Sequence, residues 1–325
     1  MQKSLLFLGG SGFIGKSLLS LFATNGIKNP KIKKLTLISN NIKEIKKIAN
    51  NSKFKKKIFI KSQNLLNVKD LPYADLIIHA AEYIDSKKIL KNYKNKKDIK
   101  TLENVFSILK KKKFKNSRIL YISSGAVYRN RNLKKKIRLR ENSNLQIIKN
   151  EPTSPMEIYI RNKLIGETFT RNLATKYNRK TSVVRCFALI GKFLPLKSHY
   201  VMGNFIGSIL ENKSINIFEK SSRNVYRSYL HIEELIDPLI KIVNYSNKSC
   251  PVFNLGSDKP ISIWGLSKLV SNNYNLKFVY PRQNNNKFDF YVPNISKLKK
   301  VFNFKQKFDL KKSISYTLES IKKLK

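Results

Sequence analysis

The chain has 325 residues, 41% of them hydrophobic and 11% aromatic, a composition that excludes a disordered protein and allows one or two folded domains. Its 66 Lys and Arg outnumber its 20 Asp and Glu, giving a formal net charge of +46, but the lysines are spread from end to end. A dispersed excess differs from the stripe or tail of a nucleic-acid-binding surface, so nucleic acid is not the expected main partner.

The first part of the chain alternates buried strands with amphipathic helices. The predicted strands are residues 3–8, 35–39, 58–60, 75–81, 118–124 and 182–188. The predicted helices are residues 13–26, 41–50, 98–112 and 156–178. This alternation predicts an α/β protein with a Rossmann-type, doubly wound parallel sheet and right-handed crossovers. After about residue 189 short apolar runs alternate with loops, which indicates a smaller C-terminal lobe built over the carboxyl edge of the sheet.

Three glycines in FLGGSGFIG, residues 7–15, separate the first strand from the first helix. In a dinucleotide fingerprint one glycine allows the tight turn, another lets a pyrophosphate approach the backbone, and the third lets helix and strand pack closely. The start of the helix would supply free N–H groups to the phosphates. The residues expected at the cofactor here are Gly9, Gly12, Phe13, Ile14 and Gly15. A plain glycine-rich turn is the alternative.

The end of the second strand bears on which dinucleotide is bound. A carboxylate there would hold the ribose hydroxyls of NAD and repel a 2′-phosphate. This chain has Ser39 and Asn40 at that place, with Lys43 close behind. The expected cofactor is therefore NAD(P), with a slight preference for NADP. The alternative is that Lys43 is an ordinary solvated residue, since lysines are frequent throughout the chain.

Tyr159 and Lys163, in YIRNK, are four residues apart and share one face of the predicted long helix. A free tyrosine has a pKa of about 10, and a neighbouring ammonium would lower that value by favouring the phenolate. Tyr159 could then move a proton at neutral pH. Taken alone, such a pair also arises by chance in a lysine-rich chain.

Other classes of protein are not expected. No apolar run is long enough to cross a bilayer. Two cysteines, Cys186 and Cys250, cannot form a disulfide framework, which suits the reducing cytoplasm. The sequence has no paired cysteines or clustered histidines, so no metal site is expected.

Most of the chain, taken in order, resembles the extended short-chain dehydrogenase/reductases of the NAD(P)-dependent epimerase/dehydratase family. The segments that carry the resemblance are GGSGFIG at 9–15, DLIIHAA at 75–81, YISSGAVY at 121–128, YIRNKLIGE at 159–167, MGNFI at 202–206, RSYLHI at 227–232 and FNLGS at 253–257. The second of these is similar to the family's D-x-V-I-H-x-A-A strand. The resemblance implies an NAD(P)-binding Rossmann domain of residues 1–188 with a returning segment at about 228–258. Residues 189–227 and 259–325 would form the smaller substrate-binding lobe.

The resemblance also implies a role for each matching residue of the first domain. Tyr159 would be the acid/base, Lys163 its electrostatic partner and a cofactor contact, and Ser124 the donor that positions the sugar hydroxyl or carbonyl. Ala80 and Ala81 would lie against the cofactor. Near the adenine, Asn64 and Leu65 stand where relatives often have an aspartate and its neighbour, although Asn64 is alternatively a turn residue. Asp98 departs from the family pattern, where relatives often have an asparagine.

In the second lobe, the expected contacts to a nucleotide-sugar substrate are His199, Asn204 and Arg227. Asn204 and Arg227 would meet the diphosphate, the latter as a bidentate fork. The alternatives without substrate binding are a helix cap for Asn204 and a surface ion pair for Arg227. His79 and His231 are expected to be structural, and His199 is the histidine placed beside the expected substrate loop.

The resemblance leaves two reactions open. A 4,6-dehydratase needs carboxyl groups at the two positions after the first hydroxyl residue, and these are Ser124 and Gly125 here, so dehydration is not expected. A nucleotide-sugar 4-epimerase or 4-ketoreductase remains, of the kind that commonly supplies sugars for surface polysaccharides. A cofactor-binding regulator or RNA-binding protein is the alternative, although retention of Ser124, Tyr159 and Lys163 argues against it. Relatives often pair helices, which makes a homodimer one expectation.

Overall fold

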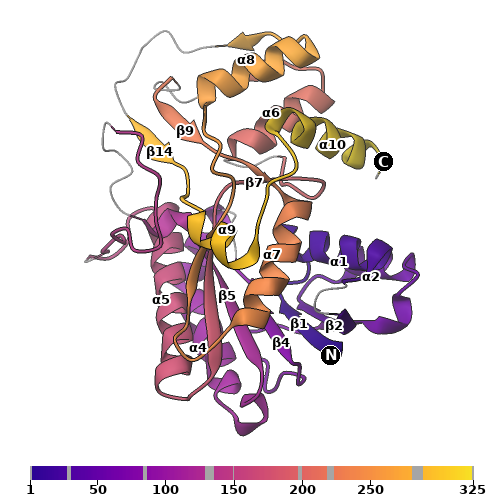
Figure 1. Ribbon diagram of the computed structural model, residues 1–325, viewed down its shortest axis with the longest axis vertical. Helices are drawn as coiled ribbons and strands as arrows, with labels where there is room; N and C mark the ends of the chain where they lie inside the picture. Colours follow the sequence, from indigo (N-terminus) through magenta and orange to yellow (C-terminus); the bar gives the residue numbers. More distant parts are fainter. Residues whose placement is uncertain are drawn as a thin grey trace. The chain divides into compact units, whose positions relative to one another are not determined.

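The computed structural model describes residues 2–27, 31–82, 86–128, 135–148, 150–196, 200–217, 223–279 and 288–323. The chain divides into two compact units (Figure 1). The first unit comprises Met1–Val127, Gln146–Arg185 and Ile236–Phe253. The second unit comprises Tyr128–Leu145, Cys186–Leu235 and Asn254–Lys325.

The main sheet has seven strands in the order β11-β6-β5-β4-β1-β2-β3. The strands are β1 (Gln2–Leu8), β2 (Lys31–Ser39), β3 (Ile58–Ser62), β4 (Leu76–His79), β5 (Arg118–Ser124), β6 (Lys180–Cys186) and β11 (Val252–Leu255). Strand β1 pairs in parallel with β2 and β4, and parallel pairs also join β2 to β3 and β4 to β5. Since the chain starts near the middle of the sheet and crosses to both sides, the predicted doubly wound α/β class is confirmed.

Apolar runs explain the central strands. Leu5–Leu8 of β1 and all of β4 are buried, as expected for parallel strands covered on both faces. The helices that follow the strands are α1 (Phe13–Asn25), α2 (Lys43–Asn50), α3 (Ser86–Lys94), α4 (Lys97–Leu109), α5 (Pro155–Thr175) and α7 (Ile232–Tyr245). Helix α3 is a difference from the sequence-based expectation. Its sequence, SKKILKNYK, buries only Ile89, so it carries little apolar periodicity.

Helices α4 and α5 lie side by side and α5 runs along β5, as Figure 1 shows. Their apolar residues, including Phe106 and Leu173, join Tyr121 of β5 in one buried cluster. A Cβ atom on Gly166 of α5 would come within 2.1 Å of the Tyr121 ring. Glycine at this position therefore lets α5 pack directly on β5, and this contact sets where the side chains of α5 lie.

The start of α5 has strong local signals. Ser154 is the N-cap and accepts a hydrogen bond from the Glu157 N–H (3.2 Å), while the Glu157 carboxylate accepts from the Ser154 N–H (3.3 Å). Pro155 occupies the first turn. This reciprocal capping box ends the preceding loop and begins the helix at the predicted place.

The second unit contains short strands and helices. Its three-stranded sheet has the order β12-β9-β14, with β9 (Val225–Arg227) antiparallel to β12 (Ile261–Ser262) and parallel to β14 (Asp289–Tyr291). Two further small sheets pair β7 (Leu189–Ile190) with β10 (Leu230–His231) and β8 (Ile215–Asn216) with β13 (Phe278–Val279). The helices are α6 (Val201–Leu210), α8 (Ile263–Tyr274), α9 (Ser296–Phe302) and α10 (Leu310–Lys322).

The sequence analysis did not predict these helices of the second unit. The last of them, α10, begins at the N-cap Asp309, whose carboxylate accepts from the Lys312 N–H (2.7 Å), and buries Ile314 and Leu318. Such short helices depend on tertiary packing for most of their stability, so their sequences carry a weak local signal.

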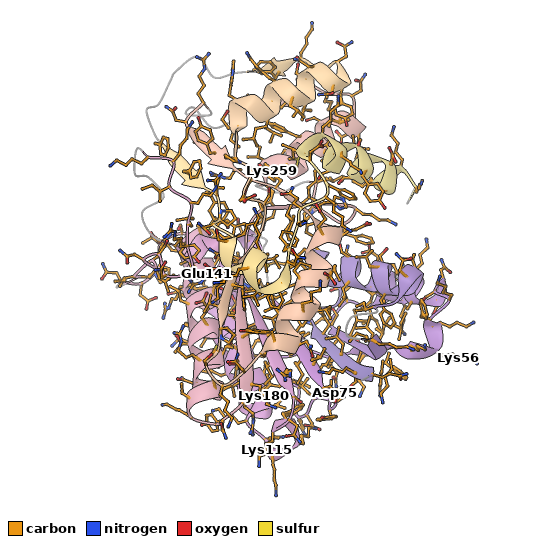
Figure 2. The ribbon with its side chains drawn as sticks, viewed as in Figure 1. Lys56, Asp75, Lys115, Glu141, Lys180 and Lys259 are labelled. Carbon is orange, nitrogen blue, oxygen red and sulfur yellow. The ribbon has the colours of Figure 1, made fainter. Side chains whose placement is uncertain are left out.

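Two surface properties follow from the described part of the chain. None of its helices combines the length and apolar character needed to cross a membrane. Figure 2 shows Lys56, Lys115 and Lys180 at separate places in the first unit. These three basic side chains come from different elements and do not gather in one stripe.

Candidate active site

The glycine turn follows β1 and is held against two neighbouring strands. The N–H groups of Gly9 and Gly10 both donate to the Ile38 carbonyl at the end of β2 (2.9 and 3.0 Å). Gly9 has a φ of 98°, and a Cβ there would lie 2.8 Å from the backbone of Ala81. Only glycine suits this conformation and this close approach. The structure thus brings Ala80 and Ala81, predicted at the cofactor, to the glycine turn.

The first turn of α1 fits a bound anion. Gly12 is its N-cap and provides no side-chain hydrogen bond, and the first turn contains no acidic residue. A Cβ on Gly15 would lie 2.5 Å from the Gly10 carbonyl oxygen, so the helix starts directly on the turn. Helix N–H groups without a side-chain cap, next to a turn in which glycines occupy positions 9, 10 and 12, match the needs of a dinucleotide pyrophosphate. Phe13 and Ile14 lie in this turn and are half-buried.

The carboxyl end of β2 presents hydroxyls. The Ser39 and Ser11 hydroxyl oxygens are 2.5 Å apart, and Asn40 is exposed. Glu44 is the first carboxylate after β2 in the sequence, and its oxygen lies 3.0 Å from the Lys16 ammonium. A ribose at this edge would therefore meet serine and asparagine side chains before a carboxylate.

Asn64 and Leu65 follow β3. Asn64 is exposed, and its side-chain oxygen accepts from the Leu66 N–H (3.0 Å), as in an Asx turn. The Leu65 side chain is buried in the core cluster. The structure therefore gives Asn64 the turn geometry that was its alternative interpretation, and Leu65 a packing role.

Lys163 connects the long helix to the end of β5. Its ammonium donates to the Ile122 carbonyl (2.8 Å) and lies 5.5 Å from the centre of the Tyr159 ring. Ser124, the last residue of β5, is buried, and its hydroxyl oxygen accepts from the Ala126 N–H (3.1 Å). The packing of α5 on β5 thus places the predicted Tyr159–Lys163 pair against the strand that ends at Ser124.

Sequence reasoning missed Glu82. Its carboxylate forms an ion pair with Lys163, and the two side chains are only 13% and 6% exposed. Burial raises the pKa of the Glu82 carboxyl, against the Lys163 charge and hydrogen bond that lower it. The signal was present, because D-x-V-I-H-x-A-A counted from Asp75 puts its last alanine at Glu82.

A second carboxyl group lies beside this pair. Asp98, in the first turn of α4, accepts a hydrogen bond from the Asn162 amide of α5 (3.3 Å). Burial raises the pKa of Asp98 to about 6, against hydrogen bonds from Asn162 and Asn92 that lower it. The departure from asparagine noted in the sequence therefore adds a titratable group whose charge acts on Glu82.

One turn further along α5, Glu167 makes a fully hydrogen-bonded ion pair. Arg185 of β6 donates to both carboxylate oxygens, from Nε (2.9 Å) and from Nη2 (2.7 Å). The Ser123 hydroxyl also donates to Glu167 (2.6 Å). All three residues are buried, so this network joins α5 to β5 and β6 next to Ser124.

The described histidines are neutral at physiological pH. Burial and the nearby Lys163 charge lower the pKa of His79 to about 3. Burial alone lowers the pKa of His231 to about 4. Both rings are packed against aromatic side chains, which fits their predicted structural roles. His199, predicted near the substrate, lies outside the described residues.

In the second unit, Asn204 and Arg227 lie on different elements. Asn204 is inside α6, whose N-cap is Tyr200, so it is not a helix cap. Arg227, at the end of β9, has Nη2 2.9 Å from the Asp289 carboxylate and donates from Nη1 to the Tyr226 carbonyl (2.8 Å). The ion pair that was its alternative interpretation is therefore present, and the Arg227 side chain as a whole remains 24% exposed.

Residues 5–256 match the NAD dependent epimerase/dehydratase family. The match takes in the glycine turn, Ser124 and the Tyr159–Lys163 pair, and it spans well over half of the chain. The chain belongs to this family. The recognised resemblance is thereby confirmed, and with it an enzyme of the extended short-chain dehydrogenase/reductase type.

Solved structures share the fold over the whole chain. A UDP-N-acetylglucosamine 4-epimerase from Methanobrevibacter ruminantium, in complex with UDP-N-acetylmuramic acid, is 21% identical with a TM-score of 0.77, over 100% of this chain and 99% of that one. A variant UDP-glucuronic acid 4-epimerase from Bacillus cereus, in complex with NAD and a fluorinated substrate analogue, is 18% identical with a TM-score of 0.78, over 100% of both chains. A dTDP-glucose 4,6-dehydratase from Bacillus anthracis, in complex with NAD, is 16% identical with a TM-score of 0.75, over 99% of this chain and 97% of that one.

At these identities the likeness shows the fold. Both epimerases and a dehydratase share it, so the fold alone does not select the reaction. No curated protein sequence matches the chain.

Proposed function

We propose that the protein is an NAD(P)-dependent nucleotide-sugar 4-epimerase or 4-ketoreductase, which moves a hydride and a proton at one sugar carbon. The observation that carries this proposal is the position of Tyr159 and Lys163 on α5, packed against the strand that ends at Ser124. The glycine turn in the same unit supplies the place for a dinucleotide.

Each of the three residues has a distinct task in this proposal. The Tyr159 hydroxyl exchanges a proton with the sugar oxygen, and Ser124 holds that oxygen by a hydrogen bond. The Lys163 ammonium holds its position through the Ile122 carbonyl and acts on the charge of Tyr159. A bound nicotinamide dinucleotide supplies the donor or acceptor of the hydride.

The carboxylates of the first unit support a reaction without loss of water. The positions after Ser123 are Ser124 and Gly125, so no acid stands where a 4,6-dehydratase needs one. Of the carboxyl groups described in this part of the unit, Glu82 is paired with Lys163 and Glu167 with Arg185, whereas Asp98 is hydrogen-bonded to Asn162. An elimination needs a carboxyl group available for proton transfer at the substrate, which argues against dehydratase chemistry.

We propose NADP as the preferred cofactor. The edge after β2 offers the Ser39 hydroxyl and Asn40, and Glu44 is engaged by Lys16. A 2′-phosphate would meet no free carboxylate in this stretch and would benefit from the positive charge of the chain. In the second unit, we assign Asn204 and Arg227, whose side chain is partly exposed, to the diphosphate of the substrate.

A parallel fluorescence titration with NADH and NADPH is the first test. Tight binding of NADPH that exchanges readily is expected for a ketoreductase, whereas a cofactor that is hard to remove is expected for an epimerase. The variant Gly9→Val is the control for the dinucleotide site, because its side chain would overlap Ala81. If the wild-type protein bound neither dinucleotide, the oxidoreductase proposal would fail.

Activity can then be assayed with UDP-N-acetylglucosamine and UDP-glucuronic acid, the sugars named for the two similar epimerases. Tyr159→Phe should still bind the dinucleotide but lower kcat/KM by about 10²–10⁴-fold, the usual contribution of a general acid/base. Retention of full activity in Tyr159→Phe would exclude the assigned role.

A further inference from the structure

The ammonium of Lys163 is held in a buried setting in direct contact with a carboxylate. It forms an ion pair with Glu82 and donates to the Ile122 carbonyl (2.8 Å). It also lies 5.4 Å from the centre of the Tyr121 ring and 5.5 Å from that of Tyr159. The catalytic tyrosine therefore faces an ammonium that already has a carboxylate beside it.

Among the described residues, β4, β5, α4 and α5 contribute titratable groups near Lys163, and these groups differ in charge. From β4, His79 is neutral, because burial and Lys163 lower its pKa to about 3. From β5, the Tyr121 phenol stays protonated, because burial raises its pKa. Asp98 of α4 is hydrogen-bonded to Asn162, and Glu167 of α5 is neutralised by Arg185. Glu82 is the carboxylate that contacts Lys163 directly.

Elementary electrostatics gives the direction in which the Glu82 charge changes the ionisation of Tyr159. A positive charge near a phenol favours the phenolate, and a negative charge favours the protonated form. A carboxylate in contact with the ammonium offsets part of the positive field that the ammonium exerts at Tyr159, because the two opposite charges are adjacent. In a buried site this offset is weakly screened by solvent.

We propose that Glu82 is a positioning residue of the Tyr159–Lys163 pair: it fixes the ammonium and offsets its charge, so that Tyr159 keeps its proton to higher pH and is set to act as a proton donor. This role rests on the proposed function. In the reducing direction, Tyr159 gives its proton to the sugar carbonyl oxygen as the carbon accepts the hydride. The phenol O–H bond breaks as the sugar O–H bond forms. The sugar C–H bond would form with the hydride that a bound dihydronicotinamide releases from its own C–H bond, so that the carbonyl would be reduced and the dinucleotide oxidised.

The test follows the ionisation of Tyr159 in the full-length protein without cofactor or substrate. The 15 tyrosines are labelled with ¹³C at Cζ, and the Tyr159 signal is identified by its loss in Tyr159→Phe. We expect Glu82→Gln, which keeps the shape and removes the charge, to lower the ionisation midpoint of Tyr159 by about one pH unit. The conservative variant Glu82→Asp should keep the wild-type midpoint within about 0.3 unit.

Asp98→Asn is the matched control, because it removes a nearby carboxyl that is hydrogen-bonded to Asn162. It should shift the Tyr159 midpoint by less than about 0.3 unit. A shift in Glu82→Gln no larger than that in Asp98→Asn, or a shift to higher pH, would overturn the proposal. A purely structural role for Glu82 would change stability without moving this midpoint downward.

A second comparison remains informative if Glu82→Gln does not fold with Lys163 left unpaired. Lys163→Met is compared with the double variant Glu82→Gln/Lys163→Met, which contains no unpaired charge at this place. Tyr159 should ionise at lower pH in the double variant, and equal midpoints would contradict the proposal. Because these titrations need no ligand, their failure is distinct from failure of the proposed function, which would appear as absent dinucleotide binding.

Discussion

Glu167 and Lys163 lie one turn apart on α5, and each forms a buried ion pair with a residue of the first unit. The inner pair, Glu167–Arg185, is bidentate, receives a further hydrogen bond from Ser123, and is almost inaccessible to solvent. The outer pair, Glu82–Lys163, is slightly more exposed and lies beside Tyr159 and the titratable Asp98.

The two ion pairs differ in their expected roles: the inner pair stabilises the fold, and the outer pair influences an ionisable group. In the inner pair every charged group has partners, so it joins three elements in one geometry and has little freedom to change. In the outer pair, burial raises the pKa of the Glu82 carboxyl and Lys163 lies 5.5 Å from the centre of the Tyr159 ring, so we expect a change of charge there to change the ionisation of Tyr159. Four changes test this comparison.

Breaking the inner pair should have the largest effect. Arg185→Met leaves the Glu167 carboxylate buried without its partner and is expected to lower the free energy of unfolding by about 4 kcal/mol. Urea unfolding followed by circular dichroism measures this loss. The double variant Arg185→Met/Glu167→Leu removes both charges and should recover most of the loss. A single-variant loss under about 1 kcal/mol would mean that the inner pair does not hold α5 in place.

Breaking the outer pair should cost less, and the cost should depend on pH. In Lys163→Met, Glu82 loses the partner that lowers its pKa, so its folded-state pKa rises further above the unfolded value. A carboxyl with a raised folded-state pKa is fully compatible with the fold below its unfolded pKa, and stability declines as pH rises toward the folded pKa. We expect a loss of about 3 kcal/mol at pH 8 and about 1 kcal/mol at pH 4.5. Equal losses in urea unfolding at both pH values would contradict this.

Weakening the N-terminal cap of α5 should increase local opening near the outer pair more than near the inner pair. Ser154→Ala removes the N-cap hydrogen bond from Glu157 N–H and should cost about 1 kcal/mol. Hydrogen exchange measured by mass spectrometry should speed up in the turn that contains Tyr159 and leave the turn around Glu167 protected, because helix ends fray locally. Ser154→Thr is the control that retains a capping hydroxyl. Uniformly faster exchange along α5 would show that the two ends are not independent.

An exposed ion pair should contribute the least to the free energy of unfolding. Asp237 and Lys241 are four residues apart on α7, and the Lys241 Nζ lies 2.8 Å from an Asp237 carboxylate oxygen. The Asp237 side chain is 60% exposed and the Lys241 side chain 33%. Asp237→Asn should lower the free energy of unfolding by about 0.4 kcal/mol at low salt, and by less in 0.5 M NaCl, because solvent and ions screen the pair. If this change cost as much as breaking the outer pair, burial would not explain the difference between the pairs.

Much of the first unit could be predicted because its signals are local. Continuous apolar runs such as that of β4 are typical of strands covered on both faces of a parallel sheet. The glycine turn is identified by the strand before it and the helix after it, and the spacing of Tyr159 and Lys163 places them on one face of α5.

The second unit was harder to predict because its elements depend on contacts between distant segments. Helix α10 is as long as α1, but its buried residues alternate with lysines and serines and become recognisable only when the helix is packed. Arg227 is a motif residue in the sequence, but its ion pair with Asp289 arises from the pairing of β9 with β14. No spacing along the chain predicts that pairing.

By itself, the sequence determined the α/β class, the glycine turn and the identity of the Tyr159–Lys163 pair, because each depends on periodicity or on residues within a few positions of one another. Only the tertiary structure decided the electrostatic setting of that pair. Glu82 follows β4, Asp98 begins α4 and Lys163 lies on α5, so these residues meet only when the helices pack on the sheet. Burial then gives their charges a strength that sequence separation does not reveal.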